Sequence, residues 1–161
     1  MTEVLRGPGG SVSPRHPVSP LVGLDLVEVG RFERALLRHP RLLERLFTPA
    51  EIAYCLARSR PGLHLAARFA AKEAVGKLLG QGVLVWKDIE IRGPEPIAKG
   101  EVCSRSLAPV NQLAAAGAPR VILHGSAAEA AKRQGIASVA VSLSHTESLA
   151  GACAVGLRSE S

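Results

Sequence analysis

The segment LVGLDLVEVG at residues 21–30 decides how this chain begins its fold, because it places an acidic side chain inside an apolar run. Its leucines and valines favour a β-strand with at least one buried face, and Asp25 lies among them. An ionised carboxylate in such a place costs free energy unless a hydrogen-bond donor, a cation or a metal compensates it. Asp25 is therefore either a structural residue, bonded to backbone donors or to an arginine, or part of a charged site.

The composition fits one folded domain. The chain has 161 residues, of which 47% are hydrophobic and 21% are charged, as in ordinary globular proteins. Aromatic residues make up 3%, which argues against a stacking platform for single-stranded nucleic acid. The formal net charge of +6 favours an anionic partner, which could be a nucleic acid, a phosphate-rich ligand or an acidic protein. Charge alone does not choose among them.

The cysteines and the apolar runs bear on the compartment. Cys55, Cys103 and Cys153 lie far apart with no CxxC spacing, which indicates reduced thiols rather than a disulfide framework or a zinc site. The N-terminal residues lack the apolar core of a secretion signal, and no uncharged apolar run approaches membrane-spanning length. We therefore expect a soluble, cytoplasmic protein that has no membrane partner.

The segments around residues 21–30 predict the rest of the fold. Residues 1–20 are rich in proline, glycine and serine and are expected to form a disordered tail. The expected order is a strand at 21–29, helices at 31–39, 48–58 and 63–80, one or two strands within 83–92, a helix at about 106–116, a strand at 120–124, a helix from 126 to about 135, and a hairpin of strands at 137–144 and 149–156. Pro40 stops or restarts the first helix. This mixture predicts an α+β domain over residues 21–158, with a small mixed or antiparallel sheet packed with helices.

Two helix starts have capping signals. Thr48 and Glu51 fit a capping box with Pro49 at the first helical position. Ser126 and Glu129 have the same spacing and predict a second capping box.

The long predicted helix at 63–80 carries a second carboxylate of interest. Phe69 and Glu73 are four residues apart and share a face, and Lys77 lies one turn further on. Glu73 is then either half of a surface pair with Lys77 or a carboxylate turned toward the core. If Asp25 and Glu73 met, they would repel unless a proton or a divalent cation lay between them. Two carboxylates completed by water and phosphate oxygens are a common set of Mg²⁺ ligands.

Other candidate residues lie at two turns and on one helix face. His145 follows Val-Ser-Leu-Ser in the hairpin turn and is either merely exposed or part of a site. Gly80 and Gly82 end the long helix, although a GxG pair also lets the backbone approach a phosphate. The arginine ridge is the set of residues spaced three and four apart from 31 to 45, namely Arg31, Arg34, Arg38, Arg41 and Arg45. The ridge is either solvated or docks an acidic partner.

Four stretches of the chain occur in a recognisable order. They are GLDLVEVGR at 23–31, RFAAKEAVGKLLGQG at 68–82, WKDIEI at 86–91 and VSLSHT at 141–146. Together they resemble the holo-acyl-carrier-protein synthase family of 4′-phosphopantetheinyl transferases, over about residues 21–157. The tail before residue 20 has no counterpart in that family, and residues 95–116 resemble an insertion.

The resemblance implies a fold and an activity. Family members are small α+β homotrimers with active sites between subunits. They transfer 4′-phosphopantetheine from coenzyme A to a serine of an acyl carrier protein, use Mg²⁺ and release adenosine 3′,5′-bisphosphate. The resemblance implies a role in fatty acid biosynthesis, and no nucleic acid takes part.

The resemblance also implies roles for the candidate residues. Asp25 and Glu73 would be the metal ligands, and Glu73 or a metal-bound water would accept the serine proton. Lys77 and His145 would join these two in the catalytic set. The residues expected to contact coenzyme A are Arg68, Lys72, Lys77, Gly80, Gly82, His145 and Thr146. The residues expected to dock the carrier are Arg31, Arg34, Arg38 and Arg41.

Two alternatives remain open from sequence. A non-enzymatic basic module that binds an acidic protein or a nucleic acid would explain the charge and the arginine ridge. It would leave Asp25, Glu73 and His145 without a role. A related transferase that serves a polyketide or other specialised carrier would use the same residues, and sequence does not rank the carriers.

Overall fold

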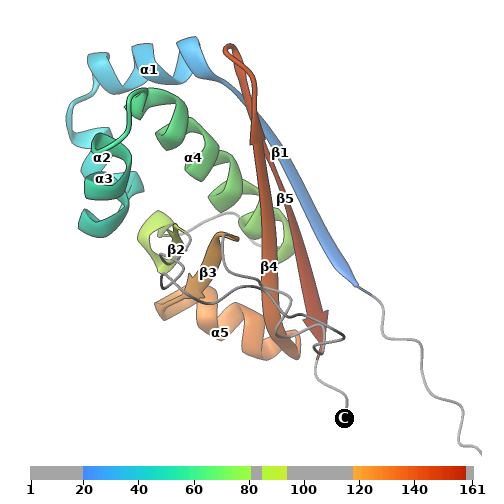
Figure 1. The fold of residues 1–161 in the computed structure, drawn as a ribbon. Helices are drawn as coiled ribbons and strands as arrows, with labels where there is room; N and C mark the ends of the chain where they lie inside the picture. The colour runs from blue at the N-terminus through green and yellow to red at the C-terminus, as the bar shows by residue number, and fades with distance from the viewer. Residues whose placement is uncertain (1–19, 81–84, 94–117, 159–161) are drawn as a thin grey trace, which may run out of the picture.

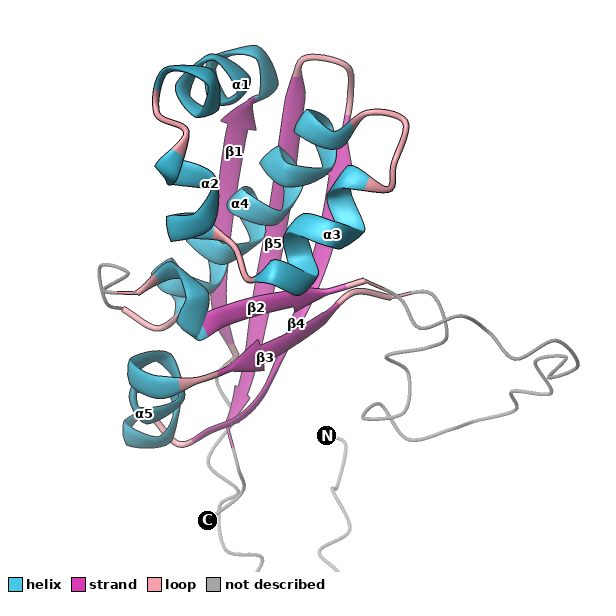
Figure 2. Cartoon of the chain, turned by 90° about the vertical axis from the view of Figure 1, so that its left-hand side faces the viewer, coloured by secondary structure: helices cyan, strands magenta, loops and turns pink. Residues whose placement is uncertain are grey.

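The computed structural model describes residues 20–80, 85–93 and 118–158. Its centre is a five-stranded antiparallel sheet in the order β1-β5-β4-β3-β2, with helices packed on one face (Figures 1 and 2). The strands are β1 (Leu21–Glu28), β2 (Ile89–Arg92), β3 (Arg120–Leu123), β4 (Ile136–His145) and β5 (Leu149–Arg158). The helices are α1 (Val29–Arg38), α2 (Arg41–Leu46), α3 (Pro49–Leu56), α4 (Pro61–Leu78), α5 (Gly125–Arg133) and the short 3₁₀ helix η1 (Trp86–Asp88). The predicted α+β class is confirmed.

The predicted elements are present with small shifts in their ends. The hairpin of β4 and β5 is confirmed, and its turn holds residues 146–148. A new helix starts after Pro40, which occupies the N-cap position of α2. Four helices rather than three therefore precede the short strands. The tail at 1–19, the helix expected at 106–116, the insertion and Gly82 lie outside the described residues.

The two predicted capping boxes differ in outcome. At α3, Thr48 Oγ1 accepts from the Glu51 N–H at 3.3 Å and Glu51 Oε2 accepts from the Thr48 N–H at 2.8 Å, which confirms the box. At α5 the prediction is wrong, because the helix begins at Gly125. The Ser126 N–H and hydroxyl both donate to Asp88 Oδ2, at 2.8 and 2.7 Å. A carboxylate from η1 therefore satisfies the first turn of α5.

Helix α4 packs directly against β1 and β5. A Cβ added at Gly23 would come within 1.9 Å of the Ala74 carbonyl oxygen, so only glycine permits this approach of strand and helix. The α4 side of the contact is built from small residues, among them Ala70, Ala71 and Ala74, all fully buried. Because side chains two apart on a strand share a face, Asp25 is turned toward α4 as Gly23 is.

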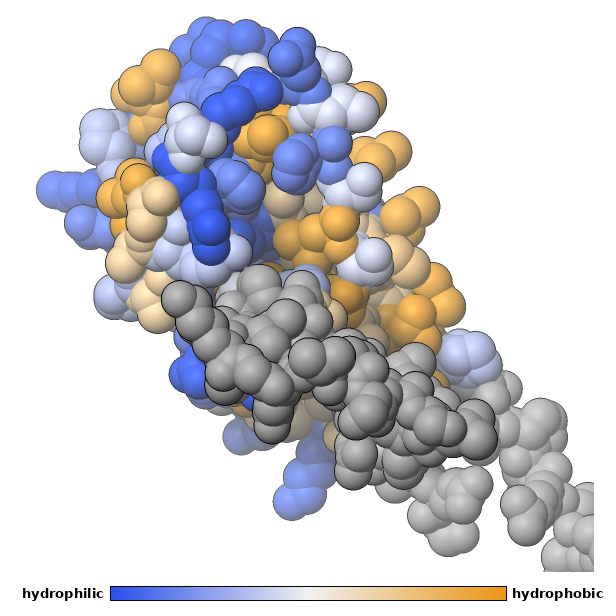
Figure 3. Space-filling view, in the orientation of Figure 1, coloured by the Kyte–Doolittle hydropathy of each residue, from blue (hydrophilic) through white to orange (hydrophobic). Residues whose placement is uncertain are grey.

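The other face of the sheet is apolar and exposed. On β1, the residues Val22, Leu24 and Leu26 are 61%, 59% and 67% exposed, and on β5 Leu149 and Leu157 are 46% and 41% exposed. Figure 3 shows hydrophobic residues along the side of the molecule where β1 lies. We call these five residues the apolar sheet face. Among the described helices, none is both long and apolar enough to cross a membrane.

Candidate active site

The partner of Asp25 is a lysine of α4. Lys77 Nζ donates to Asp25 Oδ1 at 2.8 Å and to the Leu24 carbonyl at 3.0 Å. The Asp25 side chain is 16% exposed and that of Lys77 is 55% exposed, so the pair lies at the surface end of the contact between β1 and α4. The ion pair of Lys77 is thus with Asp25, and its interaction with Glu73 is electrostatic without a direct contact of this kind among the described residues.

Glu73 lies one turn before Lys77 on α4 and belongs to the same group. Its side chain is half-buried. Burial raises the pKa of Glu73, the charge of Asp25 raises it further, and Lys77 opposes both. The two carboxylates are therefore close enough to interact, as the resemblance requires. We call Asp25, Glu73 and Lys77 the acidic cluster.

The donor set of the acidic cluster fits Mg²⁺. Mg²⁺ is usually held by one or two carboxylates, with water and substrate phosphates completing its shell. Asp25 and Glu73 supply two carboxylates from two rigid elements, and within residues 20–80, 85–93 and 118–158 no group of three or more His, Cys, Asp or Glu side chains could hold a metal. The cluster therefore suits a metal shared with a phosphate ligand better than a metal enclosed by protein alone.

His145 lies in a second cluster, near the start of α4. Its ring meets the ring of His64 edge to face, with centroids 5.8 Å apart. Burial lowers the pKa of His64, and the charges of His145, Arg68 and Arg58 lower it further. Arg60 also forms an ion pair with Glu147 at 3.8 Å, which joins the start of α4 to the β4–β5 turn. This end of the molecule is suited to an anion.

Arg68 belongs to the same end of α4. Its side chain is buried, its guanidinium carbon lies 4.0 Å from the centre of the Tyr54 ring, and Arg58 lies 4.3 Å from that ring. Within the described residues its Nε has no hydrogen-bond partner. Burial raises the pKa of the nearby Cys55 thiol, and Arg68 opposes that shift. We call Arg58, His64, Arg68 and His145 the basic cluster.

Helix α4 separates the two clusters. Arg68 and Glu73 are five residues apart, so they point about 140° apart around the helix axis. Arg68 packs on Tyr54 of α3, whereas Glu73 interacts with Asp25 of β1. The structure thus brings Asp25, Glu73 and Lys77 together, and it brings Arg68 and His145 each near His64, but the two sets lie on different sides of one helix.

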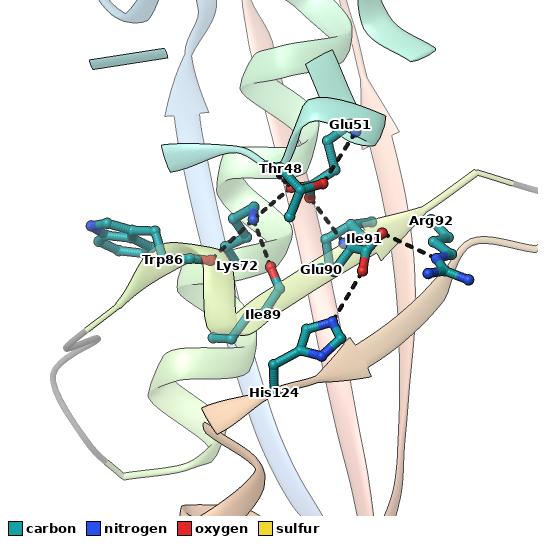
Figure 4. Close-up of polar contacts among 9 residues, drawn as sticks. All are labelled: Thr48, Glu51, Lys72, Trp86, Ile89, Glu90, Ile91, Arg92 and His124. Carbon is teal, nitrogen blue, oxygen red and sulfur yellow. Dashed lines mark hydrogen bonds and ion pairs between the residues drawn. The ribbon is translucent and has the colours of Figure 1, made fainter. Parts of the chain in front are cut away.

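Lys72 corrects a prediction. Its side chain is fully buried, and Nζ donates to Glu51 Oε2 at 2.9 Å, to the Trp86 carbonyl at 3.0 Å and to the Ile89 carbonyl at 2.6 Å (Figure 4). An ammonium has three N–H donors, and all three are used. Burial lowers the pKa of Lys72, and Glu51 opposes this. The prediction that Lys72 contacts a phosphate is therefore wrong.

The remaining predicted residues have simpler environments. Gly80 has φ +64° and is exposed, as expected at the end of a helix. Thr146 holds the β4–β5 turn, since its N–H donates to the Leu149 carbonyl at 2.8 Å and its Oγ1 accepts from the Leu149 N–H at 3.2 Å. The described residues of the arginine ridge are all exposed, and Arg34 also pairs with Glu28 at 3.7 Å. Their roles in binding stay predictions.

Sequence reasoning missed several residues around these clusters. His64 is four residues before Arg68 on α4, so the shared face was visible in the spacing. Tyr54 gave no comparable signal, because it meets Arg68 only through the packing of α3 on α4.

Glu90 was also missed. It is buried on β2 and accepts from Arg92 Nε at 3.0 Å, while its Oε2 lies 3.0 Å from His124 Nε2.

Comparison with known proteins defines the class to which this fold and these clusters belong. The family model described as the 4′-phosphopantetheinyl transferase superfamily matches residues 21–128. That match takes in β1, with Asp25, and all of α4, with Glu73 and Lys77. The chain belongs to the 4′-phosphopantetheinyl transferase superfamily, and the resemblance found in the four motifs is confirmed.

Particular relatives within this class carry one name. The chain is 48% identical over 135 residues to the holo-[acyl-carrier-protein] synthase of Moorella thermoacetica, with 83% of this chain and 90% of that protein covered. It is 39% identical over 137 residues to the holo-[acyl-carrier-protein] synthase of Syntrophus aciditrophicus, with 83% and 91% covered.

Solved structures agree with these relatives. The holo-[acyl-carrier-protein] synthase of Helicobacter pylori, in complex with coenzyme A, has a TM-score of 0.61 at 28% identity, and 84% of this chain and 98% of that chain are covered. The corresponding enzyme of Neisseria meningitidis has a TM-score of 0.65 at 27% identity, with 84% and 95% covered.

Proposed function

We propose that this chain is a holo-[acyl-carrier-protein] synthase. It transfers 4′-phosphopantetheine from coenzyme A to a serine hydroxyl of an apo acyl carrier protein and releases adenosine 3′,5′-bisphosphate. The observation that carries the proposal is the acidic cluster, in which the Asp25 and Glu73 of two family motifs meet beside an exposed lysine. The relatives' names and the coenzyme A complex of the Helicobacter pylori protein support it.

Each residue of the acidic cluster has a role in the proposed reaction. When the serine attacks the pyrophosphate, negative charge grows on phosphoryl oxygens and on the leaving group. The exposed ammonium of Lys77 can meet those oxygens beside Asp25. The serine proton is accepted either by Glu73 itself, which lies beside Asp25, or by a water that the metal would hold there. Mg²⁺ held by Asp25 and Glu73 would supply further charge stabilisation.

The assembly we propose is a homotrimer in which each site uses two subunits. The acidic and basic clusters lie on different sides of α4, which favours sites that a second chain completes. The apolar sheet face offers a surface for a second copy, since exposed apolar patches often mark interfaces. In sedimentation, the wild type should have the mass of a trimer. Leu24→Asp should dissociate it and reduce transfer, whereas an active monomeric wild type would contradict the assembly.

The docking site we propose for the carrier is the arginine ridge. Arg31 and Arg38 are exposed on α1, and Leu37, which is 80% exposed, lies beside them. Charge complementarity should steer an acidic carrier to this surface, more strongly at low salt. Arg38→Glu should raise KM for the carrier and leave coenzyme A binding unchanged. Unchanged carrier kinetics at low salt would show that the ridge is only a solvated surface.

One experiment tests the reaction itself. The chain is incubated with coenzyme A, Mg²⁺ and a panel of apo carriers from fatty acid and polyketide systems, and the intact mass of each carrier is measured. The expected result is the mass increase of one phosphopantetheine, absent with EDTA and absent on a carrier whose acceptor serine is alanine. If no carrier gained mass while the protein still bound acidic partners, the basic-module hypothesis would replace the transferase.

A further inference from the structure

The buried pair Glu51–Lys72 joins elements that are distant in sequence. Lys72 lies on α4, Glu51 on α3, and the two carbonyls that accept from Lys72 belong to η1 and β2 (Figure 4). Glu51 holds three donors in turn: Oε2 accepts from Lys72 and from the Thr48 N–H, and Oε1 accepts from the Ile91 N–H at 2.9 Å. Both side chains of the pair are fully buried, so any effect on the reaction acts through the helix.

Stability alone does not explain why a charged pair occupies this position. A buried ion pair is costly to desolvate, and apolar side chains of similar volume often fold as well or better in its place. Directed hydrogen bonds define the position and rotation of the helix more narrowly than apolar contacts do, because they are satisfied in a single arrangement. The rest of the α4 interface is rich in alanine, including Ala70, Ala71 and Ala74, and such small side chains give little shape to resist rotation or sliding.

The position of the pair on α4 connects it to the acidic cluster. Lys72 immediately precedes Glu73, and neighbouring helix residues point about 100° apart. Lys72 therefore holds α4 against α3 and η1, while the Gly23–Ala74 contact holds it against β1. These two contacts hold α4 from different sides, at the residues immediately before and after Glu73.

We propose that Glu51 and Lys72 are positioning residues for the transfer reaction, which set the rotation of α4 that turns Glu73 toward Asp25. This inference rests on the proposed function and assigns Lys72 no contact with substrate. A shift of about 1 Å in a reacting group can cost roughly a hundredfold in rate, so a small turn of α4 would be visible in kcat.

The test compares a double variant that removes both charges of the pair, a single variant that keeps the charge, and a control. Glu51→Gln/Lys72→Met removes both charges at similar volume and should keep the fold, as judged by circular dichroism. Lys72→Arg keeps the charge but changes its shape. Lys87→Met is the matched control, because Lys87 is an exposed lysine on η1, next to the Trp86 carbonyl that accepts from Lys72.

The double variant should lower kcat by about ten- to a hundredfold, with KM for coenzyme A unchanged. It should also bind Mn²⁺ more weakly than the wild type in a calorimetric titration without substrate, which reports the Asp25–Glu73 geometry independently of activity. Lys72→Arg alone should also lower kcat, because a larger guanidinium would overpack this fully buried position. Lys87→Met should match the wild type in every measurement.

The possible failures are distinguishable. If the wild type transferred nothing to any carrier, the proposed function would fail, and the Mn²⁺ titration would still test whether the pair positions the carboxylates. An active wild type with a double variant of unchanged kcat and Mn²⁺ affinity would overturn the positioning role. A raised KM for coenzyme A at constant kcat, restored by Lys72→Arg, would overturn it in favour of a phosphate contact. Loss of the fold in both Lys72 variants would also overturn it, since the pair would then maintain the fold as a whole.

Discussion

Lys72 and Lys77 stand five residues apart on the same helix, and each is paired with a carboxylate, yet they differ in almost every physical respect. The Lys72–Glu51 pair has side chains 0% and 1% exposed, and backbone groups complete its hydrogen bonds. The Lys77–Asp25 pair has side chains 55% and 16% exposed, with Glu73 beside it. One pair is closed to solvent and ligand, and the other is open to both. Burial therefore decides which lysine of a shared motif belongs to the fold and which can take part in chemistry.

The largest expected effect is a loss of transfer when a carboxylate beside the exposed Lys77 is replaced. Asp25→Ala and Glu73→Ala should each reduce transfer by at least about a hundredfold, because each removes one of the two carboxylates proposed to hold Mg²⁺. Both should keep the wild-type far-UV circular dichroism spectrum. The check is the initial rate of carrier modification at saturating Mg²⁺, and a near-normal rate for Asp25→Ala would remove the metal-ligand assignment.

The next prediction compares the two lysines in stability. Lys72→Met leaves Glu51 as an unpaired buried carboxylate and should lower the free energy of unfolding by about 3–5 kcal/mol. Lys77→Met should lower the urea midpoint by much less, because the Lys77 ammonium is exposed, although Asp25 loses the cation that compensates it. Urea unfolding curves of the two variants at neutral pH measure the difference. Equal midpoints would show that burial does not distinguish the pairs.

The same contrast explains how much of the fold and the site could be predicted from sequence. Features with a local signal were found: the alternation of β4 and β5, and the Thr48–Glu51 capping box. The cap of α5 was misassigned, because its carboxylate comes from Asp88, 38 residues away. Contacts of that kind depend on tertiary packing, which no spacing rule encodes.

The assignment of Lys72 failed for a related reason. An amphipathic helix has one apolar face that tells which residues are exposed, but α4 is buried on most of its sides. Its alanines and valine therefore did not indicate whether Lys72 or Lys77 faced solvent. Asp25 and Lys77 were both identified as candidates, but their pairing across 52 residues was visible only once β1 and α4 were in place.

A smaller effect concerns the cost of keeping the acidic cluster charged. The raised pKa of Glu73 means that the folded state binds this proton more tightly than the unfolded state does. Stability is then lost as pH rises from the ordinary value of 4.5 through the raised pKa. Glu73→Gln should therefore be at least as thermally stable as the wild type at pH 7 to 8 in EDTA, although it is inactive. Differential scanning calorimetry measures this, and a clearly lower midpoint for the variant would contradict the repulsion.

The smallest expected effect lies at Glu90. Its carboxylate is buried, as in the Glu51 pair, but its partners Arg92 and His124 are exposed. Burial alone would raise the pKa of Glu90, but the hydrogen bonds with Arg92 and His124 outweigh burial and lower it below its ordinary value of 4.5. A lowered carboxylate pKa contributes stability that is present above the unfolded value and is lost as pH falls through the folded one. Arg92→Gln removes part of that contribution, so its unfolding midpoint should fall below that of the wild type at pH 6 to 7. The two midpoints should converge as pH falls through the lowered pKa of Glu90, below which the carboxyl is protonated in both proteins. A constant difference between the two proteins from pH 7 down to pH 3 would mean that Arg92 stabilises β2 by packing and not by its charge.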